Sequence, residues 1–307
     1  ERALADALHV SRTTVTAAYT ELRDGGYLHA RRGARSTIAL PQSPSAPVAD
    51  SPTPINLAVA SLAAPASAVQ EAFLEATRQS AAHLQLTGHD LRGVLALRAV
   101  IAERYCARGL PTNPDQIMIT SGAQHAIGLI LSTYVQSGDR VLVEQPTYHG
   151  ALSAIAASGA RPVPVPLTDT GWDLDALHAT VRQLSPSMAY LVPDNQNPTG
   201  LMMPQAQRTQ LAGIISETRM RTVIDETMTD VWLDEPAPPP MAAAMTARHD
   251  LVLTIGSMSK SFWAGLRIGW IRAEPSTLAT IRAVRPAIDL GTSVIEQLAA
   301  AVLLERR

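Results

Sequence analysis

The chain has 307 residues, 46% of them hydrophobic, and a formal net charge of −2, as expected for a globular protein with one large and one small domain. No apolar run approaches the roughly 18 residues of a membrane span, no segment resembles a signal peptide, and the charge gives no chain-wide attraction to nucleic acid. The one cysteine, Cys106, excludes an internal disulfide and indicates a reducing cytoplasm.

Residues 1–40 predict two short helices and a two-stranded hairpin. The first helix ends near Leu8, Ser11 is the N-cap of the second, and the hairpin strands lie at 27–28 and 36–40. This order is typical of a partial winged helix-turn-helix, although a helical hairpin with a solvated arginine loop is the alternative. The residues expected to face DNA are Ser11, Arg12, Thr13 and Thr14 in the major groove, and Arg31 and Arg32 at phosphates.

Residues 41–54, rich in proline and serine, predict a linker, and residues 55–307 predict a second domain. In that domain short β-branched runs alternate with helical stretches, which indicates an α/β fold with a mostly parallel sheet. Ligands of such sheets bind beyond the carboxyl ends of the strands. The predicted strands are Ile117–Thr120, Val141–Glu144, Ala189–Val192, Thr222–Ile224, Leu251–Ile255 and Arg267–Ile271.

Lys260 is the single lysine among 25 lysine and arginine residues. Arginine stays protonated, whereas a lysine whose pKa is lowered can condense with an aldehyde. The position of Lys260 is also informative, because Ser257 and Ser259 precede it and Arg267 follows in a Gly-x-Arg-x-Gly frame. Hydroxyls and a guanidinium can hold a phosphate group, so this segment predicts an amine beside a phosphate site.

A second phosphate-binding element is predicted where Gly122, Ala123 and Gln124 follow a strand and open a helix. The first turn of a helix presents free N–H groups and the positive end of the helix dipole. Taken alone, the same residues are also compatible with an ordinary turn between a strand and a helix.

Three further polar or aromatic residues follow predicted strands. Asp225 ends one strand, where a carboxylate can pair with a protonated pyridine nitrogen or cap a helix. Asn197 lies in an Asn-Pro-Thr-Gly turn and can donate a hydrogen bond to a phenolate oxygen of a ligand. Tyr148 can stack on the aromatic ring of a ligand. Each residue also has an ordinary structural explanation, so the argument rests on their order along the chain.

The order of these motifs resembles that of the fold-type I enzymes of the aminotransferase class I/II family, which bind pyridoxal 5′-phosphate (PLP). The resemblance extends from about Ile55 to the end of the chain. It implies a Schiff base between PLP and Lys260, Asp225 at the pyridine nitrogen, Asn197 at the phenolic oxygen and Tyr148 on the ring. It assigns the phosphate group to Gly122, Ala123, Gln124, Ser257 and Arg267. No metal site is predicted.

The chain departs from the family at two places. Members often carry a tyrosine two or three residues after the strand-end aspartate, where this chain has Thr227 and Met228. The segment 88–93 resembles a family loop without its tyrosine, which normally reaches the phosphate of a neighbouring subunit. Both differences argue against fast transamination but not against PLP binding.

The pattern around Ser11 to Leu28 resembles the GntR family of winged-helix repressors. The order of a DNA-binding domain of this kind, a proline-rich linker and an aminotransferase-like domain resembles that of the MocR subfamily of bacterial regulators. The family's first helix and its small C-terminal domain are not found, so we expect a fragment of a longer protein. The resemblance also implies a homodimer.

Two functions therefore remain open. The favoured one is a regulator that reads an operator and senses PLP or an amino compound at Lys260; the alternative is an aminotransferase in which Lys260 transfers the α-proton of an amino acid. A degenerate fragment with neither function is the third and weaker reading.

Overall fold

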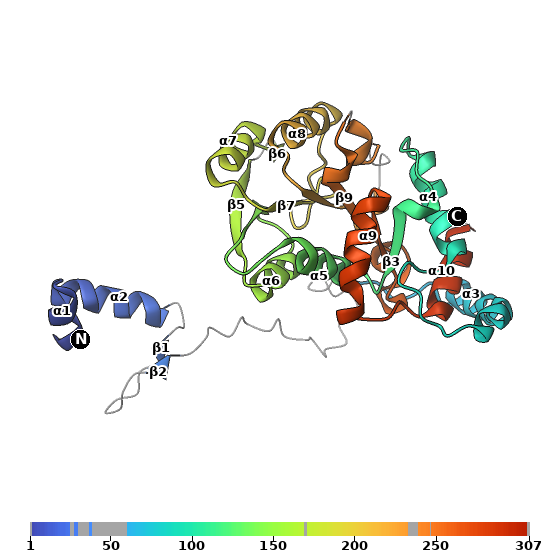
Figure 1. Ribbon diagram of the computed structural model, residues 1–307, viewed down its shortest axis with the longest axis horizontal. Coiled ribbons are helices and arrows are strands. Elements are labelled where there is room, and N and C mark those ends of the chain that lie inside the picture. Colours follow the sequence, from blue (N-terminus) through green and yellow to red (C-terminus); the bar gives the residue numbers. More distant parts are fainter. Residues whose placement is uncertain are drawn as a thin grey trace. The chain divides into compact units, whose positions relative to one another are not determined.

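The computed structural model describes residues 2–24, 28–29, 37–38, 60–168, 171–232, 239–245 and 247–305 (Figure 1). The chain forms two compact units, Glu1–Ala58 and Val59–Arg307. The predicted linker at 41–54 lies outside the described residues.

The first unit contains helices α1 (Arg2–Leu8) and α2 (Arg12–Asp24) and a short hairpin. The N–H of Thr14 donates to Oγ of Ser11 at 3.1 Å, which confirms the predicted N-cap. Strand β1 (Leu28–His29) pairs antiparallel with β2 (Thr37–Ile38). Arg31 and Arg32 lie outside the described residues.

The packing between α1 and α2 uses few apolar side chains. Ala5 and Val15 are buried, whereas Leu8 and Leu22 are 59% and 43% exposed. The apolar faces of the two helices are therefore only partly covered by their contact with each other.

The second unit is built on an eight-stranded sheet with the order β3-β10-β9-β8-β7-β4-β5-β6. The pairs from β9 to β5 are parallel, β10 is antiparallel to both of its neighbours, and β6 is antiparallel to β5. The strands are β3 (Ile117–Thr120), β4 (Arg140–Gln145), β5 (Arg161–Thr168), β6 (Gly171–Trp172), β7 (Met188–Leu191), β8 (Thr222–Asp225), β9 (Val252–Ser257) and β10 (Gly269–Arg272).

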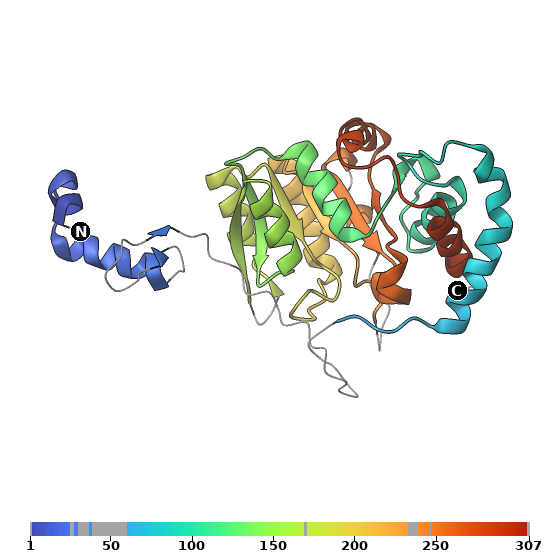
Figure 2. The ribbon, with the colours of Figure 1, turned by 90° about the horizontal axis from the view of Figure 1, so that it is seen from below.

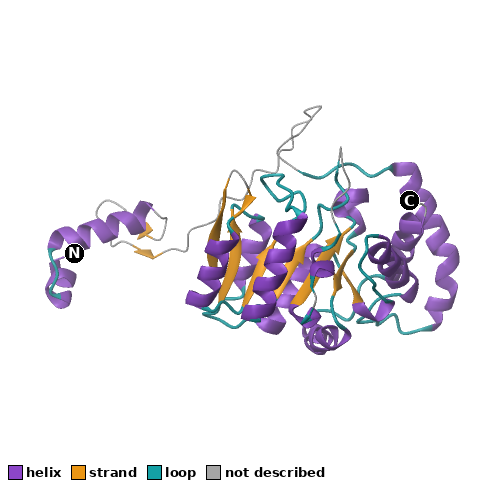
Figure 3. Ribbon diagram, turned by 90° about the horizontal axis from the view of Figure 1, so that it is seen from above, coloured by secondary structure: helices purple, strands orange, loops and turns teal. Residues whose placement is uncertain are grey.

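Helices cover both faces of this sheet, as Figure 3 shows. One core lies between the sheet and α5 (Ala123–Tyr134), α6 (His149–Ala157) and α9 (Pro275–Val284). The other core includes α7 (Leu174–Leu184) and α8 (Gln205–Thr218). Because successive residues of a strand point to opposite faces, Leu142 belongs to one core and its neighbours Val141 and Val143 to the other.

Three more helices complete the second unit beyond the β3 edge. They are α3 (Ala66–Gln79), α4 (Leu95–Ala107) and α10 (Val294–Glu305). Helix α10 packs along both α3 and α4 (Figure 2). Among the described residues, no helix has the length and apolar character needed to cross a membrane.

The mostly parallel α/β sheet is confirmed, and all six predicted strands are present with each end within two residues of its predicted position. Strands β5 and β6 were not predicted. Strand β5 carries prolines at alternate positions, Pro162, Pro164 and Pro166, which remove N–H donors from one side of the strand. Its other side pairs with β4 along its length, while β6 pairs only with Leu167 and Thr168. The prolines are therefore tolerated because they face a largely open edge.

Candidate functional site

The predicted site residues converge where the parallel strands end. Tyr148 follows β4, Asn197 follows β7, Asp225 is the last residue of β8, and Lys260 lies three residues after β9. A cavity of about 230 Å³ lies at this edge. Its lining residues are Ser61, Ala123, Gln124, Tyr148, Val192, Asn197, Asp225, Thr227, Met228, Ser257, Ser259, Lys260, Ala264 and Arg267.

Eight of the nine residues that the sequence assigned to the cofactor line this cavity. The ninth, Gly122, is the N-cap of α5 and lies behind Arg267. Sequence reasoning did not assign Ser61, Val192 and Ala264 to the site, although all three line the cavity. The loop at 88–93 does not contribute to the lining.

Lys260 lies in a short helical turn, Ser259–Trp263, and its ammonium group donates to the carbonyl oxygen of Ala60. Burial lowers the pKa of Lys260, and the charge of Asp225 opposes this effect. The chain thus holds its one lysine amine at the cavity, in surroundings that make its proton easier to lose and so assist its use as a nucleophile.

Asp225 is 5% exposed and its carboxylate is held at both oxygens. Tyr190 donates its hydroxyl to Oδ2 at 2.6 Å, and the N–H of Thr227 donates to Oδ1 at 2.8 Å. Burial raises the pKa of Asp225, while the hydrogen bonds from Thr227 and Tyr190 and the charge of Lys260 lower it. A protonated ring nitrogen beside this carboxylate would supply a further compensating charge.

Arg267 lines the cavity, and Gly122 and Gly269 pack behind it. Gly122 adopts φ +94°, and a Cβ atom there would lie 2.8 Å from a terminal nitrogen of Arg267. A Cβ on Gly269 would lie 2.6 Å from the carbonyl carbon of Gly122, so neither position accommodates a side chain. The Arg267 guanidinium donates to the carbonyl of Ser121 at 3.0 Å, which holds it at the start of α5.

Ser257 and Ser259 add hydroxyl groups to the lining of the cavity. The hydroxyl of Ser257 donates to that of Ser259 at 2.9 Å, and the N–H of Ser259 donates to Oγ of Ser257 at 3.2 Å. Together with Arg267 and the first N–H groups of α5, these groups are the donors that a phosphate requires.

Tyr148 and Asn197 lie in loops that each contain a cis proline, at Gln145–Pro146 and Asn197–Pro198. Tyr148 is half-buried and burial raises the pKa of its phenol, with the charge of Asp225 adding to this effect. The neighbouring Asn195 donates to the carbonyl oxygens of Met228 and Val231, which joins the Asn197 loop to the segment after Asp225.

The donor set fits PLP. The cavity offers an amine for the aldehyde, a carboxylate for the ring nitrogen, an amide for the phenolic oxygen and a cationic wall for the phosphate, in the order expected from the sequence.

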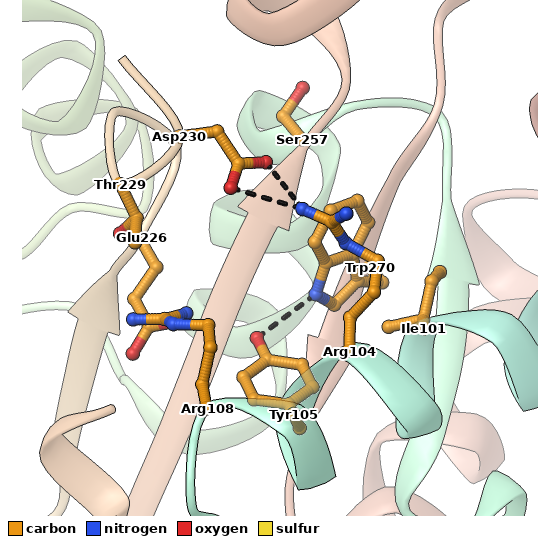
Figure 4. A pocket seen from close by; sticks show the side chains of 9 residues that line it. All are labelled: Ile101, Arg104, Tyr105, Arg108, Glu226, Thr229, Asp230, Ser257 and Trp270. Atoms are coloured by element: carbon orange, nitrogen blue, oxygen red, sulfur yellow. Dashed lines mark hydrogen bonds and ion pairs between the residues drawn. The ribbon is translucent and has the colours of Figure 1, made fainter. Parts of the chain in front are cut away.

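A second, smaller cavity of about 30 Å³ shares Ser257 with the first (Figure 4). In it Arg104 of α4 donates to both oxygens of Asp230 at 3.0 and 2.8 Å. Arg108 pairs with Glu226 at 2.8 Å, and Trp270 donates to the hydroxyl of Tyr105 at 3.0 Å. The two ion pairs hold the segment after Asp225 against α4.

The sheet order and this donor set define the class of protein as a fold-type I PLP-binding domain. The chain belongs to the aminotransferase class I and II family, whose model matches residues 52–306. The mixed sheet flanked by helices is the fold of that family, and PLP is its cofactor.

The chain is 32% identical to a 2-aminoadipate transaminase of Thermus thermophilus, over 69% of this chain and 53% of that protein. It is 26% identical to YisV, an HTH-type transcriptional regulator of Bacillus subtilis, over 100% of this chain and 69% of that protein. The crystal structure of LysN, an alpha-aminoadipate aminotransferase from Thermus thermophilus complexed with N-(5′-phosphopyridoxyl)-L-leucine, superimposes with a TM-score of 0.72 at 30% identity. That match covers 78% of this chain and 61% of that structure. The chain thus spans about half the length of the transaminase.

Proposed function

We propose that this chain is part of a transcriptional regulator that reads DNA through its first unit and binds PLP on Lys260 in its second. The observation that carries the proposal is the similarity to an HTH-type regulator over the whole chain, both units included. A transaminase has no need of a DNA-reading unit. For a regulator of the bacterial MocR type, the function also implies a cytoplasmic location.

Bound PLP supplies an aldehyde that condenses with amines and a ring that withdraws electrons. In the proposal Lys260 holds the cofactor as a Schiff base, Asp225 pairs with the ring nitrogen, Asn197 donates to the phenolic oxygen and Tyr148 packs against the ring. The residues proposed for the phosphate group are Gly122, Ala123, Gln124, Ser257 and Arg267. An amino compound that competes with Lys260 for the aldehyde would favour a different arrangement of the second unit.

The DNA contacts are proposed for the first turn of α2, where Ser11, Arg12, Thr13 and Thr14 are exposed. The hydroxyls of Ser11 and Thr14 are 2.8 Å apart and bonded to each other, so Arg12 and Thr13 are better placed to reach base edges. Arg31 and Arg32 are proposed to contact phosphates. A homodimer, as the family implies, would let two first units read two half-sites of an operator.

The second candidate function is an aminotransferase acting on an amino acid. It is favoured by the similarity to the Thermus transaminase and by the superposition on LysN. In that function Lys260, once freed from the cofactor, would move the α-proton. Met228, which lines the cavity and has no hydroxyl, weakens this candidate.

The test is the visible absorbance of the PLP-loaded, full-length protein during titration with amino acids, with Lys260→Ala as the control. A band that shifts and then persists supports a sensor, and DNA binding is then measured with and without the effective amino acid. Turnover of the amino acid to a 2-oxo acid would support the aminotransferase function and contradict the regulator function. A band that survives in Lys260→Ala would contradict both.

A further inference from the structure

A buried carboxylate lies beneath two of the loops that line the cofactor cavity. Glu144, near the carboxyl end of β4, is 2% exposed. Its Oε1 accepts hydrogen bonds from Nε1 of Trp172 at 2.6 Å and from the N–H of Val192 at 3.1 Å. Its Oε2 accepts from Nε2 of Gln196 at 3.1 Å. Among the described residues, the hydrogen-bond partners of Glu144 are neutral N–H groups, whose dipoles favour the carboxylate form.

Two opposing effects act on the pKa of the Glu144 carboxyl group. Burial raises its pKa to about 7, and the negative charge of Asp225 adds to this effect. The hydrogen bonds from Gln196, Trp172 and Val192 favour the carboxylate and oppose the rise. Burial of a carboxyl group costs free energy, and the three hydrogen bonds to Glu144 offset part of that cost.

The side chain of Gln196 also forms hydrogen bonds within the loop that contains Asn197. Its Oε1 accepts from the N–H of Thr199 at 3.0 Å and from the Thr199 hydroxyl at 2.6 Å. Its own N–H donates to the carbonyl of Leu201 at 2.8 Å. The side chain and the backbone of Gln196 thus close the turn in which Asn197 lies.

The same amide also holds the loop that carries Tyr148. Besides Glu144, Nε2 of Gln196 donates to the carbonyl oxygen of Pro146 at 2.8 Å. Both amide hydrogens are therefore used, one on Glu144 and one on the backbone two residues before Tyr148. One carboxylate–amide pair connects the two loops that contribute Tyr148 and Asn197 to the cavity.

We propose that Glu144 is a positioning residue for the cofactor, which acts through Gln196 to fix Asn197 and Tyr148 against PLP. Glu144 does not line the cavity, so it acts only through its partners. The proposal rests on the PLP binding proposed above.

Substitution of Glu144 with glutamine tests this connection with little change in shape. If the oxygen of the introduced amide kept the bonds to Trp172 and Val192, its nitrogen would face the amide nitrogen of Gln196. The Gln196 amide must then flip, which places its oxygen against the carbonyl of Pro146 and takes the acceptor away from Thr199. Glu144→Gln therefore breaks the connection to both loops while it keeps the two other bonds.

Thr222→Val is the matched control. Thr222 is buried at the opposite end of the same sheet, and its hydroxyl donates to the carbonyl of Met220 at 3.1 Å. The control removes a buried hydrogen bond at the end of β8 away from Asp225 and outside the cavity lining, so it reports the effect of a loss of stability alone.

Three quantities are measured for the wild type and both variants: the affinity for PLP, the pH midpoint of the absorbance band of bound PLP, and the amide hydrogen exchange of the protein without PLP. In Glu144→Gln we expect PLP affinity to fall roughly tenfold, which corresponds to one hydrogen bond of about 1.4 kcal/mol. The band midpoint moves to higher pH because Asn197 no longer stabilises the phenolate oxygen. Exchange becomes faster at Thr199, whose N–H loses its acceptor, and at Gln196 and Gly200 in the same turn. Thr222→Val leaves the midpoint and these amides unchanged.

Equal PLP affinity, band midpoint and exchange in the wild type and Glu144→Gln would overturn the proposal. If the wild type itself does not bind PLP, the proposed function fails, and hydrogen exchange still decides whether Glu144 holds the two loops. If Glu144→Gln does not fold, Gln196→Ala replaces it, because this variant cuts the same connection and is expected to give the same three changes.

Discussion

The phenol of Tyr190 donates a 2.6 Å hydrogen bond to Oδ2 of Asp225, and both side chains are buried. The two residues lie on the adjacent parallel strands β7 and β8. Tyr190 does not line the cofactor cavity, whereas Asp225 does. A residue outside the cavity therefore influences the ionisation of the carboxylate proposed to meet the pyridine nitrogen.

Tyr190→Phe is expected to weaken PLP binding roughly tenfold, the effect of losing one hydrogen bond to a charged group. The hydrogen bond lowers the pKa of Asp225 against the effect of burial, so its loss raises that pKa further. The affinity of the variant should therefore begin to fall at a higher pH than that of the wild type. Equilibrium PLP titration between pH 5 and 8 measures this, with Tyr134→Phe on α5 as the control. If the PLP affinities of the wild type and Tyr190→Phe begin to fall at the same pH, the role assigned to Tyr190 is contradicted.

Lys260→Arg is expected to keep the positive charge near Asp225 and to lose the visible band of bound PLP, since a guanidinium does not condense with an aldehyde. Borohydride reduction of the wild type should attach PLP to one internal peptide, because Lys260 is the chain's single lysine. Peptide mass mapping identifies that peptide and separates it from reaction at the amino terminus. A reduced adduct in Lys260→Arg at any internal peptide would refute the assignment.

The sequence was informative about the strands that lead into the site because they are continuous apolar runs followed by a polar motif. β3 and β8 illustrate this, with Gly122 and Asp225 directly after or at their ends. Strand β5 was missed because its prolines contradict strand propensity, and only the open edge beside it explains why they are tolerated. Such an edge is a property of the whole sheet and leaves no local pattern.

The sequence predicted the parts of the site in which one short motif supplies several cofactor-binding groups. It did not predict contacts between side chains that lie far apart in the sequence. The hydrogen bond from Arg104 to Asp230 joins residues 126 positions apart. Trp172 and Glu144 are 28 positions apart and lie on strands that are not neighbours in the sheet. Neither separation matches the period of a helix or a strand, so these two contacts could be recognised only from the structure.

Arg12→Ala is expected to reduce specific DNA affinity by about 1–3 kcal/mol, the range for a side chain that contacts a base edge. Arg12 is exposed at the start of α2, so the melting temperature should not change. Gel-shift titration with operator and scrambled DNA measures affinity and specificity together. Arg78→Ala is the matched control, because Arg78 is an exposed arginine of the second unit, paired with Glu75. Equal losses in the two variants would indicate a general charge effect rather than base reading.

The pH dependence of stability provides a test of Glu144 that does not involve PLP. Its pKa rises from 4.5 to about 7 on folding, so between these values the folded chain binds a proton that the unfolded chain releases. The corresponding stabilisation is fully present below pH 4.5 and is lost as the pH rises through 7. Its size is on the order of 3 kcal/mol.

Glu144→Gln cannot titrate, and the buried acids Asp225 and Glu226, whose pKa values burial also raises, are common to both proteins. The unfolding free energy of the wild type minus that of Glu144→Gln should therefore decrease between pH 4.5 and 8, because only the wild type loses this stabilisation. Urea unfolding followed by circular dichroism at several pH values measures the difference. A difference that stays constant over this range would mean that the N–H donors of Trp172, Val192 and Gln196 fully offset the burial of the carboxylate.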